Sequence, residues 1–260
     1  MKNTTPGAPM HRRSFLRTAT VATLAGATTA RAQEAYSFVL IHGAWHGAWC
    51  WQRVVPMLES RGHRVEAPTL AGVGERVGEL SDAITLDTHI EEIVDLLSTR
   101  KLWNTVLVGH SYAGAVITGV ADRVPQRLRR LVFLDAVVLE SGQSLGLPAG
   151  RDPRRPAAIP PPPATNFGIP NPADLAWVQQ NLTAHPARTF EPPLILQNPV
   201  GNGIRCIYVA CNRPAMMDHA LFRRMAQVNL GWQIRELATG HDAMVTAPGP
   251  LVDLLEKVAV

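Results

Sequence analysis

Short apolar runs and amphipathic segments alternate along the chain from residue 36 onward. A continuous apolar run bounded by turn residues is typical of a strand buried on both faces, and apolar positions three to four residues apart are typical of a helix. The predicted strands are 36–41, 63–67, one beginning at Thr105, 131–135, 204–211 and 232–237, and the predicted helices are 48–59, 86–97, 115–121, 219–228 and 251–258. This alternation predicts an α/β fold, a mostly parallel sheet with helices on both faces.

One stretch, residues 142–203, interrupts the alternation. Prolines punctuate it, including four in succession at 160–163, and only 174–185 has helical spacing. A segment of this kind is either an excursion over the surface or a lid that shapes the pocket above a functional site. Its place between two late strands of the predicted sheet favours a lid insertion.

The first 32 residues have the composition of an export signal. Residues 11–17 are basic, residues 18–29 are apolar and small, and residues 30–32 read Ala-Arg-Ala, a cleavage pattern. The adjacent Arg12 and Arg13 resemble a twin-arginine signal. We expect residues 1–32 to be a signal peptide read by the twin-arginine export machinery, and 33–260 to be one periplasmic or secreted domain. The alternative is a disordered basic leader. The apolar run is too short for a stable membrane anchor.

The charge balance depends on this leader. The whole chain holds 25 basic and 21 acidic residues, a formal net charge of +4. Five of the basic residues and none of the acidic ones lie in residues 1–32, so the remainder carries 20 basic against 21 acidic residues. The excess positive charge therefore belongs to the leader, and a nucleic-acid partner has no electrostatic support.

A candidate nucleophile stands between a strand and a helix. Residues 105–114 read Thr-Val-Leu-Val-Gly-His-Ser-Tyr-Ala-Gly, and the following segment is an apolar helix. This is the strand–turn–helix context in which the serine of a G-x-S-x-G sequence becomes a nucleophile, because the turn holds its hydroxyl out of the packed layer. Ser111 is the candidate. Ala113 stands where the closing glycine is expected, which adds a methyl group to a crowded turn.

A serine nucleophile needs a base and an acid that follow it in the chain order Ser, Asp, His. His241 lies on the loop between strand 232–237 and the last helix, so it is the predicted base. Two carboxylates keep the order: Asp135 at the end of strand 131–135, and Asp218 after strand 204–211. Asp218 is also well placed to cap the helix that follows it, so Asp135 is favoured.

Two backbone amides are expected to stabilise the oxyanion that forms during acyl transfer. One is the amide of Tyr112, directly after the nucleophile, and the other is that of Ala44 in the loop after the first strand. No carboxylate or thiolate completes a recognisable metal-ligand spacing with the histidines at positions 42, 46 and 110. The sequence therefore predicts neither a metal nor another cofactor.

Several stretches together resemble the α/β-hydrolase superfamily, and within it the hydroxynitrile lyase and plant methylesterase branch. They are residues 42–49 (His-Gly-Ala-Trp-His-Gly-Ala-Trp), 70–72 (Leu-Ala-Gly), 109–111 (Gly-His-Ser), 240–241 (Gly-His) and Pro248. The resemblance implies that Ser111 is the nucleophile, that His241 is the base, and that the amides of Ala44 and Tyr112 form the oxyanion hole.

The chain departs from this branch in two places. Members usually carry the acid just after the strand that corresponds to 204–211, where Pro214 stands here, so Asp135 or Asp218 must replace it. The lyases resemble one another in a hydroxyl residue after the first-strand histidine and a lysine after the catalytic histidine, and here Gly43 and Asp242 occupy these places. Without the lysine, a cyanide leaving group loses its positive stabiliser.

The sequence thus predicts a serine esterase that acts on small, largely apolar carboxylic esters through an acyl-enzyme. Two alternatives remain. One is a hydroxynitrile lyase-type enzyme that breaks a carbon–carbon bond, and the other is a small-molecule-binding relative with low turnover.

Overall fold

The computed structural model describes residues 1–4, 7, 35–146, 157–216 and 231–260. The chain divides into two units, Met1–Ala32 and Gln33–Val260, and the second contains all the helices and strands described below. Its main sheet has six parallel strands in the order β2-β1-β3-β4-β7-β8. The strands are β1 Ser37–Ile41, β2 Arg64–Glu66, β3 Thr105–His110, β4 Leu128–Leu134, β7 Arg205–Cys211 and β8 Trp232–Leu237.

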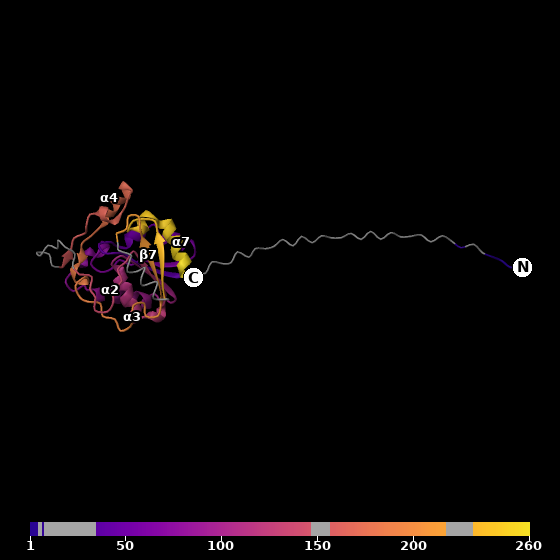
Figure 1. Ribbon diagram of the computed structural model, residues 1–260, viewed down its shortest axis with the longest axis horizontal. Helices are drawn as coiled ribbons and strands as arrows, with labels where there is room; N and C mark the ends of the chain where they lie inside the picture. Colours follow the sequence, from indigo (N-terminus) through magenta and orange to yellow (C-terminus); the bar gives the residue numbers. More distant parts are fainter. Residues whose placement is uncertain (5–6, 8–34, 147–156, 217–230) are drawn as a thin grey trace. The chain divides into compact units, whose positions relative to one another are not determined.

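Helices cover both faces of this sheet (Figure 1). The α-helices are α1 Val55–Ser60, α2 Leu86–Thr99, α3 Ala113–Arg123, α4 Pro172–Asn181, α6 Ala243–Thr246 and α7 Pro248–Ala259. Short 3-10 helices are η1 Ala48–Trp51, η2 Gly74–Glu79, η3 Pro125–Arg127, η4 Ala164–Phe167 and η5 Ala187–Thr189. The predicted α/β class is confirmed, and the predicted helix 219–228 lies outside the described residues.

The alternation of side chains along each strand divides the core into two clusters. In β3, which is buried throughout, Leu107 faces α2 and α3, whereas Val106 and Val108 face α1 and α7. Burial on both faces accounts for the continuous apolar runs of the sequence. The side chains of Thr85 and Thr88 form a reciprocal capping box that starts α2.

The predicted helix 48–59 is wrong at its centre. The segment contains η1, a short turn, and then α1. Pro56 stands in the first turn of α1, where its missing N–H would have no partner within the helix and so costs no hydrogen bond. The break at this point therefore follows from the proline.

The insertion, residues 142–203, packs at the carboxyl edge of the sheet. It contains the two-stranded antiparallel sheet of β5 Ala158–Ile159 and β6 His185–Pro186, together with η4, α4 and η5. Its Thr183 amide donates to the Trp45 carbonyl (3.0 Å), and its Phe167 carbonyl accepts from the His241 amide (2.9 Å). Trp45 follows β1 and His241 follows β8, so the insertion contacts loops at the ends of two strands.

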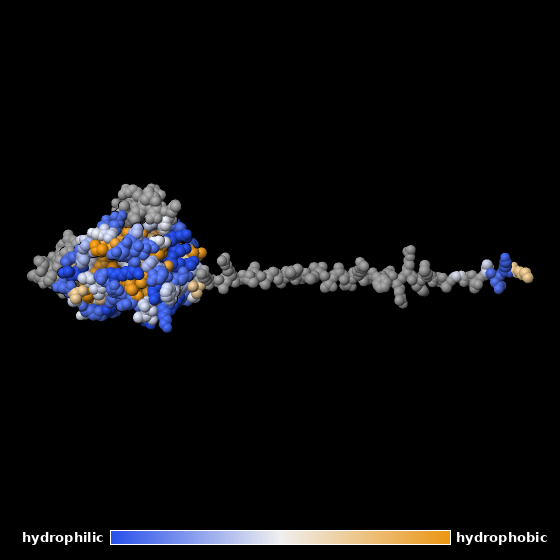
Figure 2. Space-filling model, turned by 90° about the horizontal axis from the view of Figure 1, so that it is seen from below, coloured by the Kyte–Doolittle hydropathy of each residue, from blue (hydrophilic) through white to orange (hydrophobic). Residues whose placement is uncertain are grey.

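The surface is mostly hydrophilic on the face drawn in Figure 2, and hydrophobic residues appear there as separate small patches. Large exposed hydrophobic side chains include Trp103 and Ile195. Among the residues that the structure describes, none of the helices has the length and apolar character needed to cross a membrane.

Gly114, in α3, supplies a test of the packing at the start of that helix. A Cβ added there would lie 1.9 Å from the carbonyl oxygen of Val137. We expect Gly114→Ala to destabilise the protein by about 1–3 kcal/mol and to lower Tm by several degrees, because the backbone of α3 or of Val137 must move to relieve this contact. Gly78→Ala is the matched control, since no atom lies within 4 Å of its added Cβ. Equal Tm values in a thermal melt would contradict the expectation.

Candidate active site

Ser111 occupies a strained turn between β3 and α3. Its φ is 53°, in the left-handed region, which costs a residue with a side chain about 1 kcal/mol. The turn is held from both directions: the Ser111 amide donates to Leu134 (3.1 Å), and its carbonyl accepts from Val137 (3.0 Å). Strand and helix approach each other closely at Gly109, where an added Cβ would lie 2.6 Å from the Ala113 carbonyl oxygen. Gly109 is therefore a crowded position of this turn, at which a side chain would meet the backbone of α3.

The structure brings His241 and Asp135 together. The imidazole Nδ1 lies 2.6 Å from Asp135 Oδ2, and both side chains are buried. Asp135 Oδ1 accepts from the Cys211 amide (3.0 Å), so both carboxylate oxygens have defined partners. Because Nδ1 donates to a carboxylate, the neutral ring carries its lone pair on Nε2. Nε2 is buried and has no hydrogen-bond partner among the described residues, which leaves it available as a base.

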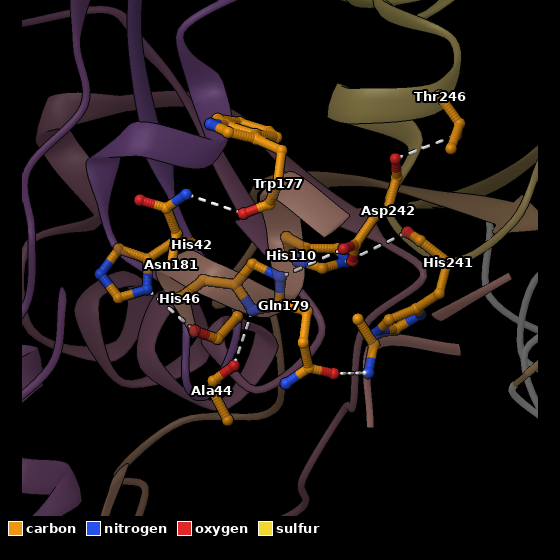
Figure 3. Close-up of polar contacts among 12 residues, drawn as sticks. His42, Ala44, His46, His110, Trp177, Gln179, Asn181, His241, Asp242 and Thr246 are labelled. Carbon is orange, nitrogen blue, oxygen red and sulfur yellow. Dashed lines mark hydrogen bonds and ion pairs between the residues drawn. The ribbon is translucent and has the colours of Figure 1, made fainter. Parts of the chain in front are cut away.

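The base loop contacts the residue next to the serine. The ring of His110 lies 4.5 Å from the ring of His241, centroid to centroid, and its Nε2 donates to the His241 carbonyl (3.1 Å). Figure 3 shows these two side chains next to each other. Because Ser111 follows His110 directly, this contact fixes the base loop against the nucleophile turn. Asp218, the alternative acid, lies outside the described residues.

The loop after β1 passes beside Ser111. A Cβ added to Gly43 would lie 2.9 Å from His110 Nδ1 and 3.0 Å from Ser111 Cβ, so only glycine fits without a shift. The next residue, Ala44, is the predicted oxyanion donor and is buried. The other predicted donor, Tyr112, is the N-cap of α3, at the positive end of that helix. Both predicted amides therefore belong to segments that adjoin the serine.

Sequence reasoning missed the roles of several buried histidines around this site. His89 lies on the apolar face of α2, where its Nδ1 hydrogen-bonds the Tyr112 hydroxyl (2.8 Å) and its Nε2 hydrogen-bonds the Ala71 carbonyl (2.9 Å). His185, in the insertion, packs against the Tyr112 ring at 4.7 Å. A histidine among the apolar positions of a predicted helix was the available signal for His89.

Burial sets the protonation of most of these rings. It lowers the pKa of His42 to about 3 and that of His89 to about 4, and it also lowers the pKa of His110 and His185. His46 is different: burial lowers its pKa, but the charge and hydrogen bond of Asp242 outweigh burial, so its pKa is raised overall. Among these five histidines, His46 is therefore the one whose pKa is raised.

These shifts predict acid sensitivity. Below about pH 6.5 the unfolded chain protonates His42 and His89, whereas the folded chain does not until about pH 3–4, so stability falls across that window. We expect Tm to drop on the order of 10 °C between pH 7 and pH 4, measured by calorimetry. His89→Gln removes one titrating group, so its Tm should fall less steeply over the same range. Parallel pH profiles for the two proteins would contradict this assignment.

One group of potential metal ligands lies here. His110, His241 and Asp242 each offer an atom within 4.8 Å of the others, and all three are buried. His241 already hydrogen-bonds Asp135 (2.6 Å), and Asp242 hydrogen-bonds His46 (3.2 Å). The nearby side chains therefore supply partners of their own, and the absence of a metal or cofactor stays a prediction.

A family model described as the alpha/beta hydrolase family matches residues 38–254. The chain belongs to this family. It is 35% identical over 242 residues to a carbendazim hydrolyzing esterase of Nocardioides sp. (strain SG-4G), covering 84% of this chain and 98% of that protein. It is 27% identical to esterase PIR7B of Oryza sativa subsp. japonica, covering 85% and 95%.

Solved structures agree with this assignment. An extracellular alpha/beta-hydrolase from a Paenibacillus species has a TM-score of 0.73 and 26% identity, covering 85% of this chain and 98% of that one. The Arabidopsis methylesterase MES16 has a TM-score of 0.70 at 21% identity, covering 86% and 98%, which supports the fold alone. The predicted resemblance and fold are confirmed, and the chain is a carboxylesterase-type hydrolase of the alpha/beta hydrolase family.

Proposed function

We propose that Ser111, His241 and Asp135 form the catalytic triad of this esterase. The observation that carries the proposal is the 2.6 Å contact between His241 Nδ1 and Asp135 Oδ2, which leaves Nε2 free to take a proton. The left-handed turn at Ser111 and its position next to His110, which binds the base loop, support its role as nucleophile. Asp135 is fixed by the Cys211 amide and can stabilise the imidazolium without moving.

The reaction proceeds in two halves. Ser111 Oγ attacks the ester carbonyl while His241 Nε2 takes the hydroxyl proton, and the amides of Ala44 and Tyr112 donate to the oxyanion. His241 then gives the proton to the leaving alkoxide, which departs as the alcohol and leaves an acyl-serine. A water molecule then attacks the acyl carbon while His241 Nε2 takes one of its protons. The bond to Ser111 Oγ breaks, the acyl group leaves as the carboxylic acid, and His241 returns the proton to Ser111 Oγ.

We propose small, largely apolar carboxylic esters as substrates, with methyl esters among them. Several relatives are named methylesterases, including methylesterase 1 of Arabidopsis thaliana, which is 38% identical over 109 residues. The insertion, proposed as the lid, contributes buried apolar side chains such as Phe167 and Phe190 beside the site residues.

The lyase alternative has less support. The place of the lyases' lysine holds Asp242, a buried carboxylate that hydrogen-bonds His46, so it supplies no positive charge to a leaving cyanide. The binding-only alternative is also weaker, because the buried His241–Asp135 contact has the orientation that general-base catalysis requires.

A serine-directed fluorophosphonate tests the triad, and a substrate panel tests the reaction. We expect one covalent adduct, mapped by mass spectrometry to the peptide that contains Ser111, and loss of ester turnover in proportion to labelling. The panel contains a methyl ester, a p-nitrophenyl acetate, carbendazim and a cyanohydrin. Full turnover after complete labelling would overturn the proposal, and cyanide release without ester hydrolysis would establish the lyase instead.

We also propose that residues 1–32 direct export by the twin-arginine machinery, so that the mature protein is periplasmic or secreted. The Arg12-Arg13 pair, the apolar run and the cleavage pattern support this. Replacement of both arginines by lysine should retain the full-length protein in the cytoplasm, measured by cell fractionation. An unchanged distribution would overturn the proposal.

A further inference from the structure

The side chain of His46 has an oxygen acceptor at each ring nitrogen. Nδ1 lies 2.8 Å from the Ala44 carbonyl oxygen, and Nε2 lies 3.2 Å from Asp242 Oδ2 (Figure 3). A carbonyl oxygen has no proton to donate, so Nδ1–H is the donor, and the carboxylate likewise accepts from Nε2–H. A ring that donates from both nitrogens is an imidazolium, and it forms an ion pair with Asp242.

This ion pair is enclosed. The side chains of His46 and Asp242 are 1% and 0% exposed. The His46 ring stacks on Trp49 (5.2 Å between centroids, 21° between planes) and meets Phe167 edge-on at 5.3 Å. Removing two charged groups from water costs desolvation free energy, which their mutual attraction and well-formed hydrogen bonds must offset.

Asp242 is itself fixed, and it directly follows the base. Its carbonyl accepts from the amides of Val245 (2.9 Å) and Thr246 (3.0 Å) at the start of α6, and also from the Thr246 hydroxyl (3.0 Å). The pair therefore joins the loop of His241 to the loop that contains Ala44. These loops follow β8 and β1, which lie at different positions in the sheet.

The peptide group between Ala44 and Trp45 is held at both of its polar atoms. Its carbonyl oxygen accepts from His46 Nδ1, and its N–H donates to Nδ1 of His185 at 3.3 Å. His185 Nε2 in turn hydrogen-bonds the Thr189 hydroxyl (2.9 Å). Trp45 has a φ of 65°, a backbone conformation that residues other than glycine rarely adopt, so the turn needs such restraints.

We propose that His46 and Asp242 are positioning residues that aim the Ala44 amide at the oxyanion. Neither touches the reacting atoms; the ion pair fixes the plane of the peptide that follows Ala44 and thereby limits rotation of Ala44 itself. A single oxyanion donor is worth about 10²–10³-fold in kcat, so partial misalignment of one costs a measurable fraction of that. This inference rests on the proposed function.

Two measurements on Asp242→Asn and His46→Gln test it. The first is kcat and KM for a p-nitrophenyl ester. The second is the inhibition constant of an aryl trifluoromethyl ketone, whose carbonyl carbon bonds to Ser111 Oγ while the hydroxyl proton moves to His241 and the oxygen becomes an oxyanion in the hole. We expect kcat to fall by about 10–100-fold, KM to change by less than about threefold, and the inhibition constant to rise by the same factor as kcat falls.

Glu256→Gln is the matched control. It disturbs another histidine–carboxylate pair, His63 Nε2 with Glu256 Oε1 at 2.9 Å. His63 is buried there, and its ring packs against Phe38 of β1 rather than against the site. This variant should lose thermal stability and keep the kcat and inhibition constant of the wild type. Where Asp242→Asn does not fold, the double variant H46Q/D242N removes both charges together, leaves no unbalanced charge and carries the same test.

Each outcome decides between the proposals. Folded Asp242 and His46 variants that retain kcat and the inhibition constant within twofold would overturn the positioning role while leaving the triad intact. An equal loss of kcat in Glu256→Gln would also overturn it, because the effect would then follow stability. A wild type that neither hydrolyses esters nor binds the ketone would overturn the proposed function and the inference together.

Discussion

Ser111→Ala is expected to lower kcat for ester hydrolysis by at least about 10⁴-fold, because the covalent step loses its nucleophile. The fold should be retained. Ser111 and alanine meet the same backbone strain at a φ of 53°, and the hydrogen bonds that hold the turn come from the backbone of this residue. The measurement is kcat with a chromogenic ester, corrected for wild-type contamination by fluorophosphonate titration.

Ser111→Gly is the companion variant. Glycine adopts a positive φ without strain, so this protein should be equally inactive and at least as stable as Ser111→Ala in a thermal melt. Loss of activity without loss of stability separates a chemical role from a structural one. Turnover within tenfold of the wild type in either variant would exclude Ser111 as the nucleophile.

Asp135→Asn is expected to lower kcat by about 10³–10⁴-fold. The Cys211 amide donates to Asp135 Oδ1, so the asparagine would direct its oxygen there and present its NH₂ group to His241. The imidazole would then accept at Nδ1 and carry its proton on Nε2, which is the wrong tautomer for a base. The size and packing of the side chain are preserved, so KM and Tm should change little.

Asp218→Asn is the control for this prediction, since Asp218 keeps the same chain order. We expect the activity of this variant to match the wild type in the same chromogenic assay. A large loss in Asp218→Asn with none in Asp135→Asn would reverse the assignment of the acid.

The fold, and the meeting of Asp135 with His241, could be predicted from the sequence for one physical reason. Parallel strands end at the same edge of a sheet, so polar residues that follow apolar runs are brought together even when they are distant in the chain. Asp135 ends one predicted strand and His241 follows another, and the structure places them in contact. The choice between Asp135 and Asp218 rested on a different argument, that Asp218 is well placed to cap the helix that follows it.

The contacts of His46 and His185 could not be predicted in the same way. His46 and Asp242 are 196 residues apart, and Trp45 and His185 are 140 apart. Neither pair follows a helical or strand period, and His185 lies in an insertion whose path depends on tertiary packing. The sequence of residues 42–49 was recognisable as a motif, but the partner that gives His46 its charge becomes visible only in three dimensions.

The position of the acid has a consequence for how this enzyme can be altered. Asp135 follows β4, which pairs with β3 in a register that sets Leu134 opposite His110. The turn after β7, residues 212–216, thus carries none of the three proposed catalytic side chains, but it contacts the loop of the base, since the Arg213 amide donates to the Thr239 carbonyl (2.9 Å). An exchange of that turn would leave the three side chains in the sequence, but it would have to keep this hydrogen bond, which helps to hold the loop of His241 in place.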